Sequence, residues 1–90
     1  MKPISTEKAP AAIGPYSQAI VSGNMMYLSG QTGLVPGSGE AAGETIEAQA
    51  EQCCKNIQAV LEAGGCDFTH VVKTTCFLAD MGDFAAFNGI

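Results

Sequence analysis

A short polar turn between two apolar runs constrains the fold of this chain more than any other feature. The first run is Tyr16–Val21, the second is Met25–Ser29, and Ser22-Gly23-Asn24 separates them. Glycine and asparagine tolerate the positive φ angles that tight turns require. The pattern predicts a β-hairpin whose second strand ends at Gly30.

Polar groups gather at both far ends of this predicted hairpin: Tyr16, Ser17 and Gln18 at its start, Ser29 and Gln31 at its finish. An antiparallel hairpin brings those two ends side by side. Gly30 adds a bare backbone that a ligand can approach closely. The sequence therefore predicts a small-molecule pocket at one edge of the sheet.

Length and charge exclude several classes of protein. The 90 residues carry a net charge of −5, with four scattered lysines and no arginine, whereas nucleic-acid binders usually show a basic patch. No apolar run approaches the ~20 residues of a transmembrane helix, and the first residues have no signal-peptide core. We expect a single cytoplasmic domain over residues 1–90, with neither a nucleic-acid nor a membrane partner.

The four cysteines lack the spacing of a metal site. Cys53 and Cys54 are neighbours on a predicted helix and point about 100° apart, and Cys66 and Cys76 complete no C-x-x-C pair. Reduced thiols, with no metal and no disulfide, are the prediction. His70 has no partner at a readable spacing and is predicted to be an exposed loop residue rather than a general base.

The middle of the chain predicts a long amphipathic helix over Thr45–Ala63. Its apolar stripe recurs every three or four residues and comprises Ile46, Ala50, Cys53, Ile57, Val60 and Leu61. Gly64-Gly65 should end the helix. The glycine-rich residues 32–43 before it lack the signature of a phosphate loop, so a flexible connection is predicted there.

The last third predicts one strand and one helix. Residues 71–79 are rich in β-branched and aromatic side chains, and neither face is fully polar. We expect a strand with one face covered by the long helix and the other by another subunit. Asp83 should cap a second helix. The chain reaches Ile90 after about two turns of this helix, so we expect a truncation at its C-terminal end.

Two motifs resemble the RidA family, also called YjgF. They are Ala-Pro-Ala-Ala-Ile-Gly-Pro-Tyr-Ser-Gln-Ala at residues 9–19 and Ser-Gly-Gln at residues 29–31. The similarity continues through the long helix, Val72-Lys73-Thr74-Thr75, Asp83-Phe84 and Asn88, and covers essentially the whole chain. It implies a chorismate-mutase-like α/β fold, an α+β sandwich with a mixed sheet and two helices on one face. It also implies a homotrimer with ligand pockets between subunits, and a chain here without the expected C-terminal strands.

The resemblance also implies an activity: hydrolytic deamination of the enamine or imine acids 2-iminopropanoate and 2-iminobutanoate to 2-keto acids and ammonia, without a cofactor. The implied substrate-binding residues are Tyr16, Ser29, Gly30, Gln31 and Asn88. The family's carboxylate-binding arginine and water-activating glutamate lie in segments after the second helix. This chain has no counterpart of either, so no catalytic residue is assigned.

Other interpretations stay open at this point. Tyr16 could be an edge-packing aromatic residue, and Ser29 could be a strand-end hydroxyl that bonds only backbone. The family has also been credited with endoribonuclease activity and translation inhibition. A non-catalytic trimer that binds small keto acids would fit the absence of the arginine and the glutamate.

Overall fold

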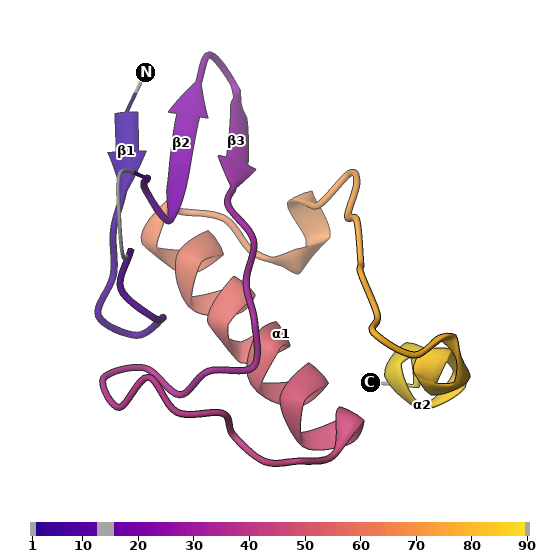
Figure 1. Cartoon of the computed structure of the whole chain (residues 1–90). Coiled ribbons are helices and arrows are strands. Elements are labelled where there is room, and N and C mark those ends of the chain that lie inside the picture. The colour runs from indigo at the N-terminus through magenta and orange to yellow at the C-terminus, as the bar shows by residue number, and fades with distance from the viewer. Residues whose placement is uncertain (1, 13–15, 90) are drawn as a thin grey trace.

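The computed structural model describes residues 2–12 and 16–89. Within them, short strands near the N-terminus precede one long helix, and a short helix follows much later (Figure 1). The class is α+β, as predicted. Ile13, Gly14 and Pro15 of the first motif lie outside the described residues, as do Met1 and Ile90.

Over the residues that the structure describes, the sheet has three antiparallel strands in the order β1-β2-β3. They are β1 Lys2–Ile4, β2 Ala19–Ser22 and β3 Met25–Leu28. β1 contains Pro3, and a proline argues against a central strand because it has no N–H to donate to the ladder. At an edge position, however, a proline costs no ladder hydrogen bond. The parallel pairing of the predicted mixed sheet is not found among the described residues.

The predicted hairpin is confirmed, with a shorter first strand. β2 begins at Ala19 rather than Tyr16, and Ser22 pairs directly with Met25. Gly23 has a φ of 62° and Asn24 has no positive φ, which is the pattern of a type II′ turn with glycine at its first central position.

The long helix α1, Ile46–Ala63, is also confirmed, and both of its ends are capped. The Thr45 hydroxyl accepts a hydrogen bond from the backbone N–H of Ala48 at 3.1 Å. At the other end, the N–H of Gly65 bonds the carbonyl of Glu62 and that of Cys66 bonds Leu61. With Gly65 at a φ of 80°, this is a Schellman motif.

The core lies between α1 and one face of the sheet (Figure 1). Val60 of α1 is completely buried and packs with Ile4, Ala9 and Ala19. Complete burial of a valine side chain contributes about 1.5–3 kcal/mol. Ala50 and Leu61 of the predicted stripe are buried too, but the stripe omitted Asn56, which is fully buried.

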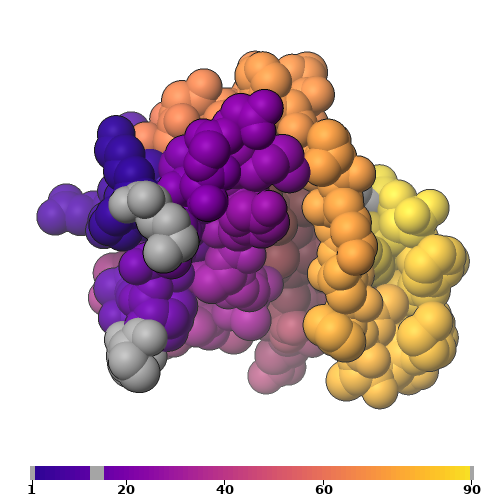
Figure 2. Space-filling view, turned by 90° about the horizontal axis from the view of Figure 1, so that it is seen from above, coloured from indigo at the N-terminus to yellow at the C-terminus, as the bar shows by residue number. Residues whose placement is uncertain are grey.

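The predicted strand over residues 71–79 is wrong. This stretch forms no ladder hydrogen bonds in the structure, although Val71 has extended backbone angles. Figure 2 shows it as an orange ridge between the hairpin and the yellow C-terminal residues. The helix α1 covers neither face of this stretch as predicted, since Val72 is 81 % and Phe77 91 % exposed in the single chain. Cover of one face by another subunit stays a prediction. A sequence rich in β-formers favours an extended backbone, but a strand also needs a neighbouring strand to bond.

Short helical turns flank this stretch: η1 Phe68–His70 before it and η2 Met81–Asp83 after it. The second helix, α2 Phe84–Asn88, contacts α1 rather than the sheet. Asp83 occupies its N-cap position but its side chain makes no capping hydrogen bond. Asp80 caps η2 instead, accepting from Gly82 N at 2.8 Å. None of the helices in the described ranges has both the length and the apolar character of a membrane span.

Candidate functional site

The two far ends of the hairpin meet, as the sequence predicted. Beyond the last pair of β2 and β3, the N–H of Ser29 donates to the carbonyl of Gln18 at 3.0 Å. The Ser29 hydroxyl donates to the same carbonyl, also at 3.0 Å. Residues that follow Ser29 therefore begin their course beside the residues that precede β2.

Gln18 has a structural role that the sequence did not reveal. Its side chain is 3 % exposed, and its Oε1 accepts from Thr6 N at 2.7 Å. Its Nε2 donates to the carbonyls of Thr6, Ala9 and Pro10, at 3.1, 3.3 and 2.7 Å. This one amide holds the N-terminal segment against β2 and sets Pro10 at the rim of the cavity described next.

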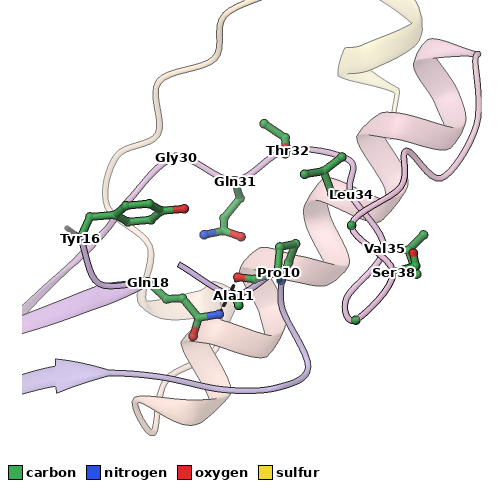
Figure 3. Close-up of a pocket in the computed structure, with 12 residues that line it drawn as sticks. Pro10, Ala11, Tyr16, Gln18, Gly30, Gln31, Thr32, Leu34, Val35 and Ser38 are labelled. Carbon is green, nitrogen blue, oxygen red and sulfur yellow. Dashed lines mark hydrogen bonds between the residues drawn. The ribbon is translucent and has the colours of Figure 1, made fainter. Parts of the chain in front are cut away.

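A cavity of about 380 Å³ opens beside the hairpin ends (Figure 3). Its walls come from the N-terminal segment, the two hairpin ends and the glycine-rich loop: Pro10, Ala11, Tyr16, Gln18, Gly30, Gln31, Thr32, Leu34, Val35, Gly37, Ser38 and Gly39. Figure 3 shows the Tyr16 ring and the Gln31 amide extending into the same space. The structure thus brings together three of the predicted site residues, Tyr16, Gly30 and Gln31.

The other two predicted residues do not line this cavity. Ser29 is adjacent in sequence, but its hydroxyl is engaged with the Gln18 carbonyl, which is the backbone-bonding alternative that the sequence left open. Asn88 is exposed at the end of α2, and Figure 1 places α2 well away from the hairpin ends. The ligand-binding roles of both residues stay predictions.

The glycine-rich loop is more firmly held than the predicted flexible connection. Leu34 and Ala41 form an isolated antiparallel bridge, and Val35 N bonds the carbonyl of Glu40 at 2.7 Å. Gly33 passes so close to α1 that a Cβ there would lie 2.6 Å from the carbonyl oxygen of Gln49. Sequence analysis missed this contact, because nothing in the sequence distinguishes Gly33 from the other glycines of the loop.

Neither the thiols nor the single histidine supplies acid–base chemistry to the cavity, because none of them is among its lining residues. Burial raises the pKa of the Cys53 thiol, and the Cys54 and Cys76 thiols add to the rise. His70 is exposed, as predicted, and its Nδ1 accepts from Asp67 N at 3.2 Å in a capping box. Over the described residues, no three side chains of the metal-binding types come together.

The Asp67 carboxyl has a lowered pKa. Thr69 donates to its Oδ1 through both the hydroxyl and the backbone N–H, and these bonds lower the pKa of Asp67, with a smaller contribution from His70. Asp67 caps η1 and is not among the residues of the cavity wall. Its shift therefore reflects a turn rather than a catalytic group.

Comparison with known proteins gives consistent matches. A family model described as Endoribonuclease L-PSP matches residues 6–90. A mouse protein, 2-iminobutanoate/2-iminopropanoate deaminase, is 54 % identical over 89 residues, covering 99 % of this chain and 66 % of its own length. The chain spans between about half and two thirds of the length of the most similar curated relatives, from 46 to 66 %.

Solved structures agree with the fold. RidA from the Antarctic bacterium Psychrobacter superposes with a TM-score of 0.94 at 47 % identity, covering 99 % of this chain and 72 % of the other. Escherichia coli TdcF, crystallised with bound serine, gives a TM-score of 0.94 at 37 % identity, covering 99 % of this chain and 69 % of the other.

Proposed function

The chain belongs to the RidA family, and from that premise we propose that the whole protein hydrolyses 2-iminopropanoate and 2-iminobutanoate to 2-keto acids and ammonia. The observation that carries the proposal is the grouping of Tyr16, Gly30 and Gln31 around one cavity. In the reaction, water adds to the imine carbon, and the resulting carbinolamine releases ammonia as its C–O bond becomes the keto C=O. No electrons are transferred, so the step requires no redox cofactor.

The residues of this chain supply the neutral part of such a site. The Tyr16 hydroxyl, the Gln31 amide and the backbone at Gly30 can donate hydrogen bonds to a small carboxylate, and Ser29 stands next to them. The sequence contains no arginine, so it offers no bidentate clamp for that carboxylate. We propose that a charged clamp and a water-activating carboxylate complete the site in the whole protein, where they supply the charge on which turnover depends.

We further propose that the whole protein is a homotrimer with its ligand sites between subunits. Large apolar side chains of the 71–79 ridge, Val72 and Phe77 among them, are exposed in the single chain. Exposed apolar area of this kind marks protein interaction surfaces. Analytical ultracentrifugation of the whole protein should give three times the chain mass, and a stable monomer at micromolar concentration would refute the trimer.

Binding without turnover is the second candidate, and the serine bound to TdcF favours it for small amino or keto acids. Ribonuclease activity, which the family description raises, receives less support from the chemistry of this chain. Its net charge is −5, and Lys55 lies 3.8 Å from Glu51 as an exposed ion pair. Phosphate contacts made by free lysines and arginines supply most of the affinity for nucleic acid.

A direct assay tests the proposal. A dehydratase generates 2-iminopropanoate, semicarbazide competes for it, and the slowing of semicarbazone formation reports hydrolysis. Two chains are compared: residues 1–90 alone, and an extended chain in which residues 1–90 are followed by the mouse relative's own sequence beyond the matched region. We expect acceleration by the extended chain only, because a charged hydrogen bond contributes roughly 1.5–3 kcal/mol and each ~1.4 kcal/mol is tenfold in rate.

The outcomes separate the candidates. Equal acceleration by both chains would show that the neutral residues suffice and would overturn the division of roles. Binding of 2-ketobutyrate by the extended chain without acceleration would favour the non-catalytic candidate. RNA binding that weakens steeply with salt would favour the ribonuclease.

A further inference from the structure

The cavity wall formed by Gln31, Thr32 and Leu34 is bonded to α1 through its main-chain carbonyls. The side-chain amide of Asn56 donates from Nδ2 to the carbonyls of Thr32 and Leu34, at 2.9 and 2.8 Å. One turn earlier on the helix, Cys53 Sγ contacts the carbonyl of Gln31 at 3.2 Å, a weaker bond because a thiol is a poor donor.

The carbonyl of Gly33, which lies between Thr32 and Leu34, is hydrogen-bonded as well. It accepts from Ala42 N at 2.9 Å. Each carbonyl from residue 31 to residue 34 therefore has a donor, and three of these bonds come from α1 side chains. The course of the wall is set by the helix rather than by the sheet.

Asn56 is the dominant member of this arrangement. Its side chain is 0 % exposed, and its Oδ1 accepts from Gln52 Nε2 at 3.0 Å. All these bonds require the amide nitrogen to face the wall and the oxygen to face Gln52, so the amide has one orientation. A buried amide with every bond satisfied is rigid, and losing one partner leaves unpaired polar groups away from water.

We propose that Asn56 is a positioning residue for the site: it holds residues 31–34 so that the Gln31 amide extends into the cavity. It acts through the wall and does not line the cavity itself. The proposal rests on the proposed function, since that function makes this cavity the site. Displacement of a positioned group by about 1 Å can cost about 100-fold in rate.

The test uses four variants of the extended chain, or of the whole protein: one at Asn56, one at its hydrogen-bond partner Gln52, and two controls. Asn56→Asp keeps the shape of the side chain but replaces the donor by a carboxylate oxygen facing two carbonyls. Gln58→Glu makes the same amide-to-acid change at an exposed position of the same helix, where the amide bonds only Glu62 at 3.0 Å. Leu61→Ala destabilises the same helix from a buried position without a bond to the wall.

We expect Asn56→Asp to lower kcat/KM for 2-iminopropanoate by about 100-fold, at a temperature where circular dichroism shows all variants folded. Gln58→Glu and Leu61→Ala should stay within about twofold of the parent. Gln52→Ala removes only the donor to the Asn56 amide oxygen. It should therefore lower kcat/KM less than Asn56→Asp does. If Asn56→Asp matches the parent, or if Leu61→Ala loses as much activity, Asn56 is merely structural and the proposal fails.

A second measurement does not depend on turnover. Hydrogen exchange of residues 31–35 should accelerate in Asn56→Asp and stay unchanged in Leu61→Ala. If the parent has no deaminase activity but this exchange pattern holds, the proposed function fails while the positioning of the wall by Asn56 stands. If the exchange of residues 31–35 is the same in both variants, the positioning proposal is overturned whatever the activity.

Discussion

At the scale of single residues, Tyr16 provides the most direct test of the cavity. Tyr16→Phe removes only the hydroxyl that extends into the space beside Gln31. A neutral hydrogen bond contributes about 0.5–1.5 kcal/mol, so kcat/KM of the extended chain should fall about two- to tenfold. Tyr27→Phe is the matched control, because Tyr27 is exposed on β3 and does not line the cavity. Equal losses in the two variants would remove Tyr16 from the site.

The Cys53 thiol gives a prediction about pH. Its pKa is raised, first by burial and then by the neighbouring thiols, and only the thiolate reacts readily with alkylating reagents. At pH 8, iodoacetamide should therefore label the exposed Cys76 well before Cys53, and labelling of Cys53 should increase as the pH approaches its raised pKa. Peptide mass spectrometry measures both rates, and faster labelling of Cys53 at pH 8 would contradict the burial of its thiol.

At the scale of elements, the contact between the glycine-rich loop and α1 admits no side chain at Gly33. An alanine Cβ there would lie 2.6 Å from the backbone oxygen of Gln49, which cannot yield as a side chain could. Gly33→Ala should cost about 1–3 kcal/mol of unfolding free energy. Gly30→Ala is the control, since its Cβ would meet nothing within 4 Å. Denaturant unfolding of the two extended-chain variants measures the difference, and equal stabilities would refute the tight contact.

The elements also show what the sequence could predict. The hairpin and α1 are specified locally, by a glycine turn, by apolar spacing and by the Gly64-Gly65 stop, so their positions were predicted to within a few residues. The strand predicted over residues 71–79 needed a neighbouring strand to bond, and a local sequence pattern does not show whether such a strand is present.

The site was predictable only where local motifs carried it. Tyr16, Gly30 and Gln31 belong to the two motifs and do share a cavity. The buried hydrogen-bonding roles of Gln18 and Asn56 escaped prediction because the bonds go to backbone groups many residues away. A polar residue in a sequence does not reveal whether its amide will be buried and bonded, and this limits inference about any site built from main-chain carbonyls.

At the scale of the whole molecule, an open strand edge and a group of exposed apolar side chains both face solvent. β3 pairs only with β2 among the described strands, so one of its edges is open, and Val72 and Phe77 are largely exposed. Open edges and apolar patches promote association. Residues 1–90 alone should therefore form concentration-dependent aggregates in light scattering, and Phe77→Lys should reduce them. A soluble monomer of the 90-residue chain with a sharp cooperative melt would contradict this prediction.

The double hydrogen bond of Ser29 has a consequence for the ligand-binding role that the sequence predicts for this residue. Both the N–H and the hydroxyl of Ser29 end on one carbonyl oxygen, that of Gln18. A ligand that recruits the hydroxyl must take it from this carbonyl, so binding exchanges one hydrogen bond for another. A neutral acceptor gains almost nothing by that exchange, whereas a carboxylate forms a bond roughly twice as strong. If Ser29 binds a ligand as the sequence predicts, its preference for anions would arise from competition with the protein's own backbone.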